Sequence, residues 1–342
     1  MKKFLIKISY TVLPVWLFFV GLAIYVWAIN DNSGDLMRLG LIDSGPEYTD
    51  SIAALALPEI YYNEIDSCEQ LKRDTCDVLV VGDSFSRGGG IGKYGNYVNY
   101  VTHDGAKRVT VFTPDKAASP VQVAYDALNL GLIDSTHITN LIVQEGERYL
   151  LDRHTHFVTT NSYIPIVPDV PAQGGGPQQA ASPLLRVKDF LFYHLMGANP
   201  IYTVELDRDM FASSEPRKLY FYFEDVEMGF DITDEQQRQI VACFDSLMAK
   251  AEKRGVNIVF VIACDKYDIY QDFIVDNPYP RKTLVDDVER WMAPHQDHFV
   301  FAKRVLHPLL EQGVKDVFLY NDTHWSPASS RVVAAEVLKK LK

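Results

Sequence analysis

The sequence predicts an α/β fold with a mostly parallel sheet, preceded by one N-terminal transmembrane helix. Two observations carry this prediction. Short apolar runs alternate along the chain with longer amphipathic segments, and a long uncharged run lies near the N-terminus. Apolar runs that stop at polar residues are typical of strands buried on both faces. Because such strands alternate with helices here, we expect a parallel sheet.

The N-terminal run predicts the cellular compartment. Residues 8–29 carry no charge and follow Lys2, Lys3 and Lys7. About 20 apolar residues span a bilayer core, and lysines on one side only indicate a cytoplasmic N-terminus. A cleavable signal is the alternative, but the run exceeds the roughly 7–15 apolar residues of a signal sequence and no small-x-small site follows. We therefore expect residues 1–30 to anchor the chain in the inner or cytoplasmic membrane, with the remainder periplasmic or extracellular.

Composition limits the function classes. The chain has 342 residues, of which 47% are hydrophobic, so it can bury a large core. Its 33 basic and 45 acidic residues give a net charge of −12. A general nucleic-acid binder is excluded, because neutralising phosphates requires a basic face. No Cys/His spacing matches a zinc site, and we expect no metal and no cofactor.

The four cysteines are too few for a disulfide scaffold. Cys68 and Cys76 lie eight residues apart before the first expected strand. Outside the cytoplasm a disulfide between them is one alternative, and two free thiols are the other. Cys243 and Cys264 lie in a helical and a strand segment, where buried thiols are expected.

The elements follow in order along the chain. Residues 31–75 are expected to form a stalk and entry segment, and residues 76–342 the catalytic domain, with an insert at about 160–230 that includes an irregular Pro- and Gly-rich stretch at 162–183. Strands are predicted at 76–84, 107–113, 138–151, 218–226, 257–267 and 315–325. Helices are predicted at 121–133, 232–255, 283–294, 301–313 and 326–341. Thr233 and Ser326 are the expected N-caps of two of these helices.

Polar residues follow several of the predicted strands. The first strand ends in Gly-Asp-Ser at 82–84, the third in residues 144–148, a later one in residues 264–267, and the last in residues 321–325. In open parallel sheets, binding and catalytic sites form at the carboxyl ends of strands. We therefore expect these four segments to approach one another.

Three of these residues have the chemistry of a serine-nucleophile site. Such a serine needs a base within hydrogen-bond reach and a third group that orients the base. Ser84 lies in a tight turn after Gly82, and Asp322 and His324 are two residues apart in a loop. Either motif alone is more often an ordinary turn or surface loop. Together, at strand ends, they predict a triad of Ser84, His324 and Asp322.

Four segments resemble a known family. They are similar to motifs of the SGNH-type O-acetyltransferases of exopolysaccharide secretion, the alginate O-acetyltransferase (AlgJ/AlgX-like) group. The four segments are Gly82-Asp83-Ser84-Phe85-Ser86, residues 145–150 (Glu-Gly-Glu-Arg-Tyr-Leu), residues 263–267 (Ala-Cys-Asp-Lys-Tyr) and residues 322–326 (Asp-Thr-His-Trp-Ser). The resemblance spans residues 77–341 except the insert. It implies an SGNH-hydrolase-like three-layer fold and a Ser-His-Asp triad.

The resemblance also implies a function. It indicates a membrane-anchored, extracytoplasmic enzyme that acetylates a cell-surface or secreted polysaccharide. The acetyl donor would be supplied by a membrane-bound O-acyltransferase partner. Three alternatives remain: a carbohydrate acetyl esterase with the same triad, an accessory protein of D-alanyl transfer to cell-wall polymers, and a non-catalytic polysaccharide-binding or assembly factor.

The sequence departs from the family in two respects. The Asp-x-His element follows the serine here, whereas it precedes the serine in the alginate enzymes. The loops after the second and third strands lack the Gly and Asn that form the oxyanion hole in ordinary SGNH enzymes. The backbone N–H of Ser84 is the expected oxyanion donor, with Gly146 N–H or Arg148 as a second.

For other residues near the predicted strand ends, a role in substrate binding and a purely structural role are the two alternatives. Arg148 is expected either to bind substrate or to pair with Glu145 or Asp322. Lys266 is expected either to face the cleft or to form a salt bridge. Trp325 is expected either to stack on a sugar or to support the His324 loop. Gly88, Gly89, Gly90 and Gly92 have no following Lys-Ser/Thr, so a loop beside the serine is favoured over a phosphate loop.

Overall fold

The computed structural model describes residues 2–32, 34–42, 52, 54–90, 92–114, 119–134, 136–159 and 183–342. Its strands are β1 (Asn63–Ile65), β2 (Val78–Val81), β3 (Val109–Phe112), β4 (Asn140–Gly146), β5 (Ile201–Glu205), β6 (Lys218–Tyr222), β7 (Asn257–Ala263) and β8 (Phe299–Phe301). Its helices are α1 (Lys2–Asn32), α2 (Asp35–Gly40), α4 (Cys68–Arg73), α5 (Ser84–Arg87), α6 (Tyr97–Gly105), α7 (Pro120–Asn129), α8 (Glu147–Thr155), α9 (Pro183–Met196), α10 (Glu224–Glu227), α11 (Asp234–Lys253), α12 (Lys266–Tyr270), α13 (Leu284–Trp291), α14 (Ala302–Glu311) and α15 (Pro327–Lys340), with 3-10 turns η1 (Gln271–Phe273) and η2 (Ala293–His298).

Six strands form one sheet in the order β1-β3-β2-β4-β7-β8, and every neighbouring pair is parallel. The predicted α/β fold with a parallel sheet is confirmed. Every residue of β2, β3 and β4 is buried. Helices cover both faces of the sheet, and this explains the continuous apolar sequence of β2 and the apolar runs within β3 and β4.

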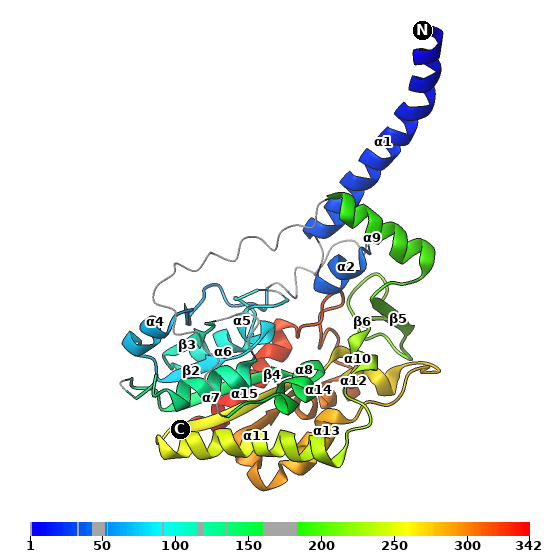
Figure 1. Cartoon of the computed structure of the whole chain (residues 1–342). Coiled ribbons are helices and arrows are strands. Elements are labelled where there is room, and N and C mark those ends of the chain that lie inside the picture. The colour runs from blue at the N-terminus through cyan, green and yellow to red at the C-terminus, as the bar shows by residue number, and fades with distance from the viewer. Residues whose placement is uncertain are drawn as a thin grey trace.

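The helices form two layers around the sheet. Helices α6, α14 and α15 pack on one face, and α7, α8 and α11 pack on the other (Figure 1). The predicted caps are present. Thr233 accepts a hydrogen bond from the Gln236 N–H at the start of α11, and Ser326 accepts one from the Ser329 N–H at the start of α15.

The strand order locates the point where a site is expected. From β2 the chain proceeds to β3 on one side, then crosses to β4 on the other side and continues to β7 and β8. The carboxyl ends of β2 and β4 therefore flank the switch point, where ligands bind in open α/β sheets. The Gly-Asp-Ser turn follows β2 directly.

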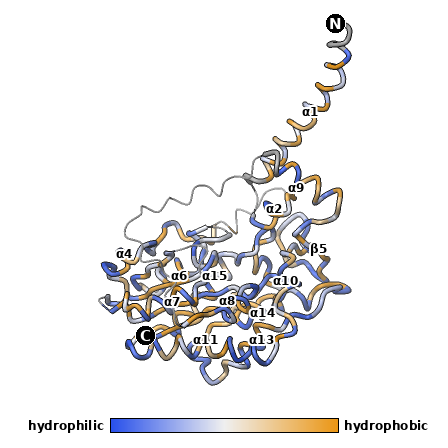
Figure 2. The backbone as a smooth tube through the Cα atoms, viewed as in Figure 1, coloured by the Kyte–Doolittle hydropathy of each residue, from blue (hydrophilic) through white to orange (hydrophobic). Residues whose placement is uncertain are grey.

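The N-terminal helix projects from the domain (Figure 1). Within the described residues, one helix is long and apolar enough to cross a membrane, at Lys7–Ile29 of α1. Most residues of this segment are hydrophobic (Figure 2), and many of its large apolar side chains are exposed. Helix α9 packs against the end of α1, and α2 packs between this pair and the hairpin of β5 and β6.

The prediction of a strand at 315–325 is wrong. This segment makes one isolated antiparallel bridge, between Phe318 and Trp325, and is otherwise a loop. Three of its carbonyl groups, those of Leu319, Tyr320 and Asp322, bond to the ammonium of Lys266 instead of to a neighbouring strand. Residues 317–320 are apolar because this loop is buried, not because it forms a strand.

Other expectations are met in part. The strand predicted at 218–226 forms as β6, but it pairs only with β5, in an antiparallel hairpin outside the main sheet. The short edge strands β1 and β8 lie outside the predicted strand segments. Most of the irregular stretch predicted at 162–183 lies outside the described residues. All four cysteines are free thiols, so the disulfide alternative for Cys68 and Cys76 is not adopted.

Candidate active site

The turn after β2 presents Ser84 to solvent. Gly82 has no space for a side chain, because a Cβ atom there would overlap Ser86 and Gln144. Asp83 then caps α5, accepting the Phe85 N–H at its Oδ1 atom at 3.1 Å. Ser84 is the first residue of this helix and is exposed, whereas Asp83 and Ser86 are buried. The serine hydroxyl is therefore accessible on a well-anchored turn.

Contacts to β4 hold this turn in place. The Oδ2 atom of Asp83 accepts the N–H of Gly146 at 3.0 Å. The Oε1 atom of Gln144 accepts both the Asp83 N–H at 3.0 Å and the Ser86 hydroxyl at 2.9 Å. Because Gln144 and Gly146 belong to β4, the serine turn is fixed relative to the neighbouring strand.

The loop at 319–324 is organised by Lys266. This side chain is fully buried at the start of α12. Its ammonium donates to the carbonyls of Leu319 and Tyr320 at 2.7 Å and of Asp322 at 3.1 Å. Burial lowers the pKa of Lys266 to about 7, an effect opposed by the nearby charges of Asp322 and Asp35. The three carbonyls surround one nitrogen, and this convergence sets the course of the loop.

Ser84, His324 and Asp322 meet at the carboxyl edge of the sheet. The Nε2 atom of His324 lies 2.7 Å from the Oγ atom of Ser84. Its Nδ1 atom lies 2.5 Å from the Oδ1 atom of Asp322, which also accepts the His324 N–H at 3.0 Å. With the neutral imidazole protonated at Nδ1, Nε2 can accept the serine proton. The structure thus brings together the three residues that the sequence paired.

Close packing fixes the imidazole ring of His324. A Cβ atom on Gly89 would overlap its ring atoms, and one on Gly90 would approach within 2.9 Å of its Cβ atom. The ring of Phe85 packs against His324 and against Trp325, each with 4.6 Å between ring centroids. The glycine-rich loop therefore lies on the imidazole, and its lack of side chains makes that approach possible.

Opposing effects set the charge states of the pair. Burial alone would lower the pKa of His324, but the charge and hydrogen bond of Asp322 outweigh it and raise the pKa above its ordinary value. Burial would raise the pKa of Asp322, but His324 and backbone N–H groups hold it far below the usual range. Asp322 is therefore ionised at neutral pH and stabilises a protonated His324.

Asp35 is a site residue that the sequence analysis missed. It begins α2, within the segment expected to be a stalk, and its N–H donates to the Oδ2 atom of Asp322 at 3.0 Å. Its carboxylate accepts the Thr323 N–H at 2.8 Å and the Thr323 hydroxyl at 2.5 Å. No local pattern marks this residue, because its partners lie 287 and 288 positions away.

One of the comparisons with known proteins gives a match. Residues 221–342 match the family model described as the SGNH hydrolase-like domain of the acetyltransferase AlgX. The C-terminal part of the chain is therefore similar to this SGNH hydrolase-like domain. The matched residues include Asp322 and His324, whereas Ser84 lies before them. No curated protein and no solved structure matches the chain.

Arg148 has partners other than the expected Glu145 or Asp322. It pairs with Asp225 at 2.9 Å and with Asp265 at 3.1 Å. Glu145 pairs with Arg153 at 2.7 Å instead. The Arg148 guanidinium also packs over the ring of Tyr222, 5.3 Å from its centroid. Arg148 thus forms ion pairs, as one of the two alternatives expected, but with other acids than the expected Glu145 or Asp322.

The other three candidates also have structural partners. The Gly146 N–H is bonded to Asp83, so it does not face an oxyanion beside Ser84. Lys266 bonds backbone carbonyls and forms no carboxylate salt bridge among the described residues. Trp325 is 3% exposed and packs between Phe85 and Tyr97, so it supports the His324 loop rather than a sugar.

Asp35, Asp322 and His324 also have the composition of a metal site. Their ligand atoms lie within 4.8 Å of one another, and among the described residues no other group of three or more acids, His or Cys lies this close. However, Asp322 is bonded to Nδ1 of His324, and Asp35 is bonded to Thr323. These bonds account for the cluster, and the donor set favours a serine triad over a metal centre.

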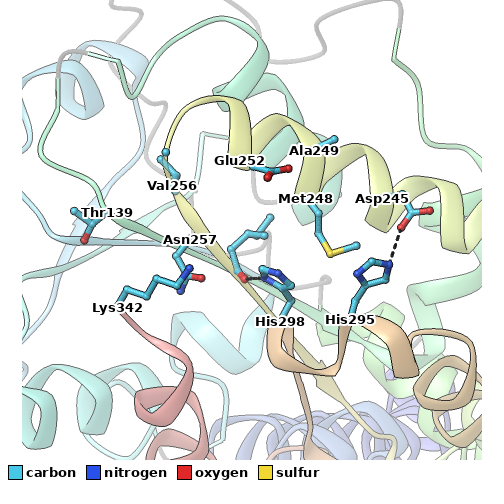
Figure 3. A pocket seen from close by; sticks show the side chains of 12 residues that line it. Thr139, Asp245, Met248, Ala249, Glu252, Val256, Asn257, His295, His298 and Lys342 are labelled. Carbon is cyan, nitrogen blue, oxygen red and sulfur yellow. Dashed lines mark hydrogen bonds and ion pairs between the residues drawn. The ribbon is translucent and has the colours of Figure 1, made fainter.

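A cavity of about 600 Å³ lies at the other edge of the sheet (Figure 3). Its lining includes Thr139 and Asn257, which stand at the amino ends of β4 and β7, together with His295 and His298. Ser84 follows the carboxyl end of β2 in the same parallel sheet. The cavity is therefore separate from the triad.

Replacing Lys266 by Met is expected to destabilise the fold by at least about 3 kcal/mol, because each of the three buried carbonyls left without this partner costs about 1–3 kcal/mol. Denaturant unfolding of the full chain in detergent measures the change. Lys339→Met is the control, since this exposed lysine pairs with Glu336 on the same helix, and its effect is expected to be below about 0.5 kcal/mol. Equal unfolding midpoints for Lys266→Met and the unmodified chain would contradict the assigned role.

Proposed function

We propose that this protein is a membrane-anchored O-acetyltransferase that acts outside the cytoplasm on a hydroxyl group of a cell-surface or secreted polysaccharide. One observation carries the proposal: the exposed hydroxyl of Ser84 lies 2.7 Å from the Nε2 atom of His324, whose other nitrogen is held by Asp322. This is the geometry that activates a serine nucleophile. The description of the matching family, which names an acetyltransferase, supports acetyl as the group transferred.

The first half-reaction loads the enzyme. His324 Nε2 takes the Ser84 proton as Oγ forms a bond to the acetyl carbonyl carbon of the donor. The bond between that carbon and the donor's leaving group then breaks, and the leaving group takes the proton from Nε2. Ser84 is left as an acetyl ester. Asp322 holds the imidazole and stabilises its protonated form during the transfer.

The second half-reaction transfers the acetyl group from Ser84 to the acceptor. The acceptor hydroxyl gives its proton to Nε2 as its oxygen bonds to the acetyl carbon. The bond from that carbon to Ser84 Oγ breaks, and Oγ regains the proton from Nε2. Each half passes through a tetrahedral oxyanion. The Ser84 N–H is the donor for this oxyanion, since the next three N–H groups of α5 are bonded to Asp83.

The position of the site supports a membrane-delivered donor. Asp35 contacts Asp322 only three residues after α1 ends at Asn32, and the apolar part of α1 ends at Ile29. From Ile29 to Asp35 the chain has three helical residues and three further residues, which together span at most about 15 Å even if the last three are fully extended. If α1 spans the bilayer, the triad thus lies near the membrane surface. A membrane-bound O-acyltransferase partner can supply the acetyl group there.

Ser84→Ala and His324→Ala are expected to lower acetyl release from an activated acetyl ester by at least about a thousandfold. Ser246→Ala, on the exposed face of α11, and His295→Ala, in the distant cavity, serve as controls and are expected to retain full activity. Adding oligosaccharide acceptors to the active protein should direct acetyl groups to sugar rather than water. Activity that persists without Ser84 would contradict the proposal, and release only to water would favour an esterase.

The activity is expected to rise with pH through an apparent pKa above 6.5, because His324 must be neutral to accept the serine proton. Asp322 raises the His324 pKa above this ordinary value, so protonation removes the base at a higher pH than for a free imidazole. The pH dependence of kcat/KM for the activated ester measures it. A profile that stays flat down to pH 5 would exclude His324 as the base.

A further inference from the structure

Helix α9 presents an apolar face beside the membrane anchor. Phe192, Leu195 and Met196 are 50%, 75% and 71% exposed. Their spacing of three and four residues places them on one side of the helix. A cluster of large exposed apolar side chains on one helix face marks a surface that binds either lipid or protein.

The contacts of α9 indicate which of the two it meets. Its other face packs on the end of α1, where Val187 joins Val26 in a buried cluster and Phe190 lies 5.9 Å from Tyr25, centroid to centroid. Val26 and Tyr25 belong to the apolar segment Lys7–Ile29. A helix that packs on the last turns of a membrane span lies at the depth of the lipid headgroups and upper acyl chains.

We propose that α9 is an interfacial helix that lies on the bilayer surface, with Phe192, Leu195 and Met196 in contact with lipid. The proposal rests on the membrane-spanning role of α1 in the proposed function. Amphipathic helices with basic residues and an apolar face bind the membrane interface in this way. In α9 the basic residues are Arg186 and Lys188, against one acid, Asp189. Lys188 lies one turn before Phe192, and its long side chain can extend from the apolar side to the headgroups. The helix thereby sets the orientation of the domain on the membrane.

A fluorescent probe at residue 195 tests this arrangement. The full chain with Cys68→Ser and Leu195→Cys, labelled with an environment-sensitive fluorophore, is reconstituted into phosphatidylcholine vesicles that contain nitroxide-labelled lipid. We expect blue-shifted emission and strong quenching by the nitroxide. The control is Lys253→Cys, at the end of α11 on the side of the domain away from α1 (Figure 1), where neither change is expected.

The outcomes separate the two proposals. If the full chain does not float with the vesicles, the anchor itself fails. If it floats but the probe at residue 195 keeps the emission of an aqueous label, α9 does not lie on the membrane. Blue-shifted emission without quenching would place α9 in a protein interface, and this result would also overturn the lipid assignment.

A different observation assigns a role to Asp35. Its side chain and N–H make three hydrogen bonds to Asp322 and Thr323, and its Oδ2 atom lies 3.6 Å from Nδ1 of His324. The Asp35 side chain is 18% exposed. We infer that Asp35 is a positioning residue: it holds the Asp322–His324 loop in register with Ser84, from the segment that leaves the anchor. This inference rests on the triad of the proposed function.

Asp35→Asn in the full chain tests this role. The amide keeps the size of the side chain but cannot accept both Thr323 bonds with the same strength. We expect kcat to fall about tenfold with KM unchanged. Arg38→Gln, on the exposed side of α2, is the matched control and is expected to retain normal kinetics.

A pH profile separates positioning from general destabilisation. The charged groups facing His324 are Asp322, Asp35 and Asp83, with Lys266 beneath the loop. Removing the Asp35 charge lowers the pKa of His324, so the acid limb of kcat should shift to lower pH. Normal kcat and an unshifted profile in Asp35→Asn, with Ser84→Ala inactive, would overturn the role of Asp35 alone. Activity in Ser84→Ala would overturn the triad itself.

Discussion

The site depends on the buried ammonium of Lys266. A single nitrogen binds the carbonyls of Leu319, Tyr320 and Asp322, and so turns an apolar segment that resembles a strand into a loop. That loop carries the imidazole of His324 to the hydroxyl of Ser84, 240 positions away in the chain. The cost of burying an ammonium is offset only when all of its donors are bonded. The geometry of the carboxyl edge of the sheet follows from this requirement.

The segment that follows α1 is part of the same arrangement. Asp35 bonds to the back of the His324 loop, while Lys266 bonds to its carbonyls. The loop is therefore fixed from two sides, once by the sheet domain and once by the segment leaving α1. This arrangement explains why Asp35, a charged residue close to the end of α1, has a side chain that is only 18% exposed. It also gives the site a defined position near the membrane in the account proposed above.

Local patterns predicted the parallel sheet, the caps at Thr233 and Ser326, and the pairing of the serine and Asp-x-His segments. These features depend on burial period, side-chain caps and the common edge of parallel strands. The features that were missed depend on contacts across the chain. Residues 315–325 form a loop bonded to Lys266 instead of the expected strand. Arg148 pairs with Asp225 and Asp265 instead of the expected acids. Asp35 bonds to residues near the C-terminal end of the sequence. The residue pattern within one segment does not indicate which residues of a distant segment it will contact.

The measurement that tests the central claim most directly is the location of the acetyl group during turnover. The full chain is mixed with an activated acetyl ester without acceptor, quenched in acid and mapped by peptide mass spectrometry. The account predicts one acetyl group on Ser84 that disappears when an oligosaccharide acceptor is added before the quench. Continued turnover with no acetyl group on Ser84, or with acetyl on another residue as the kinetically competent intermediate, would contradict it.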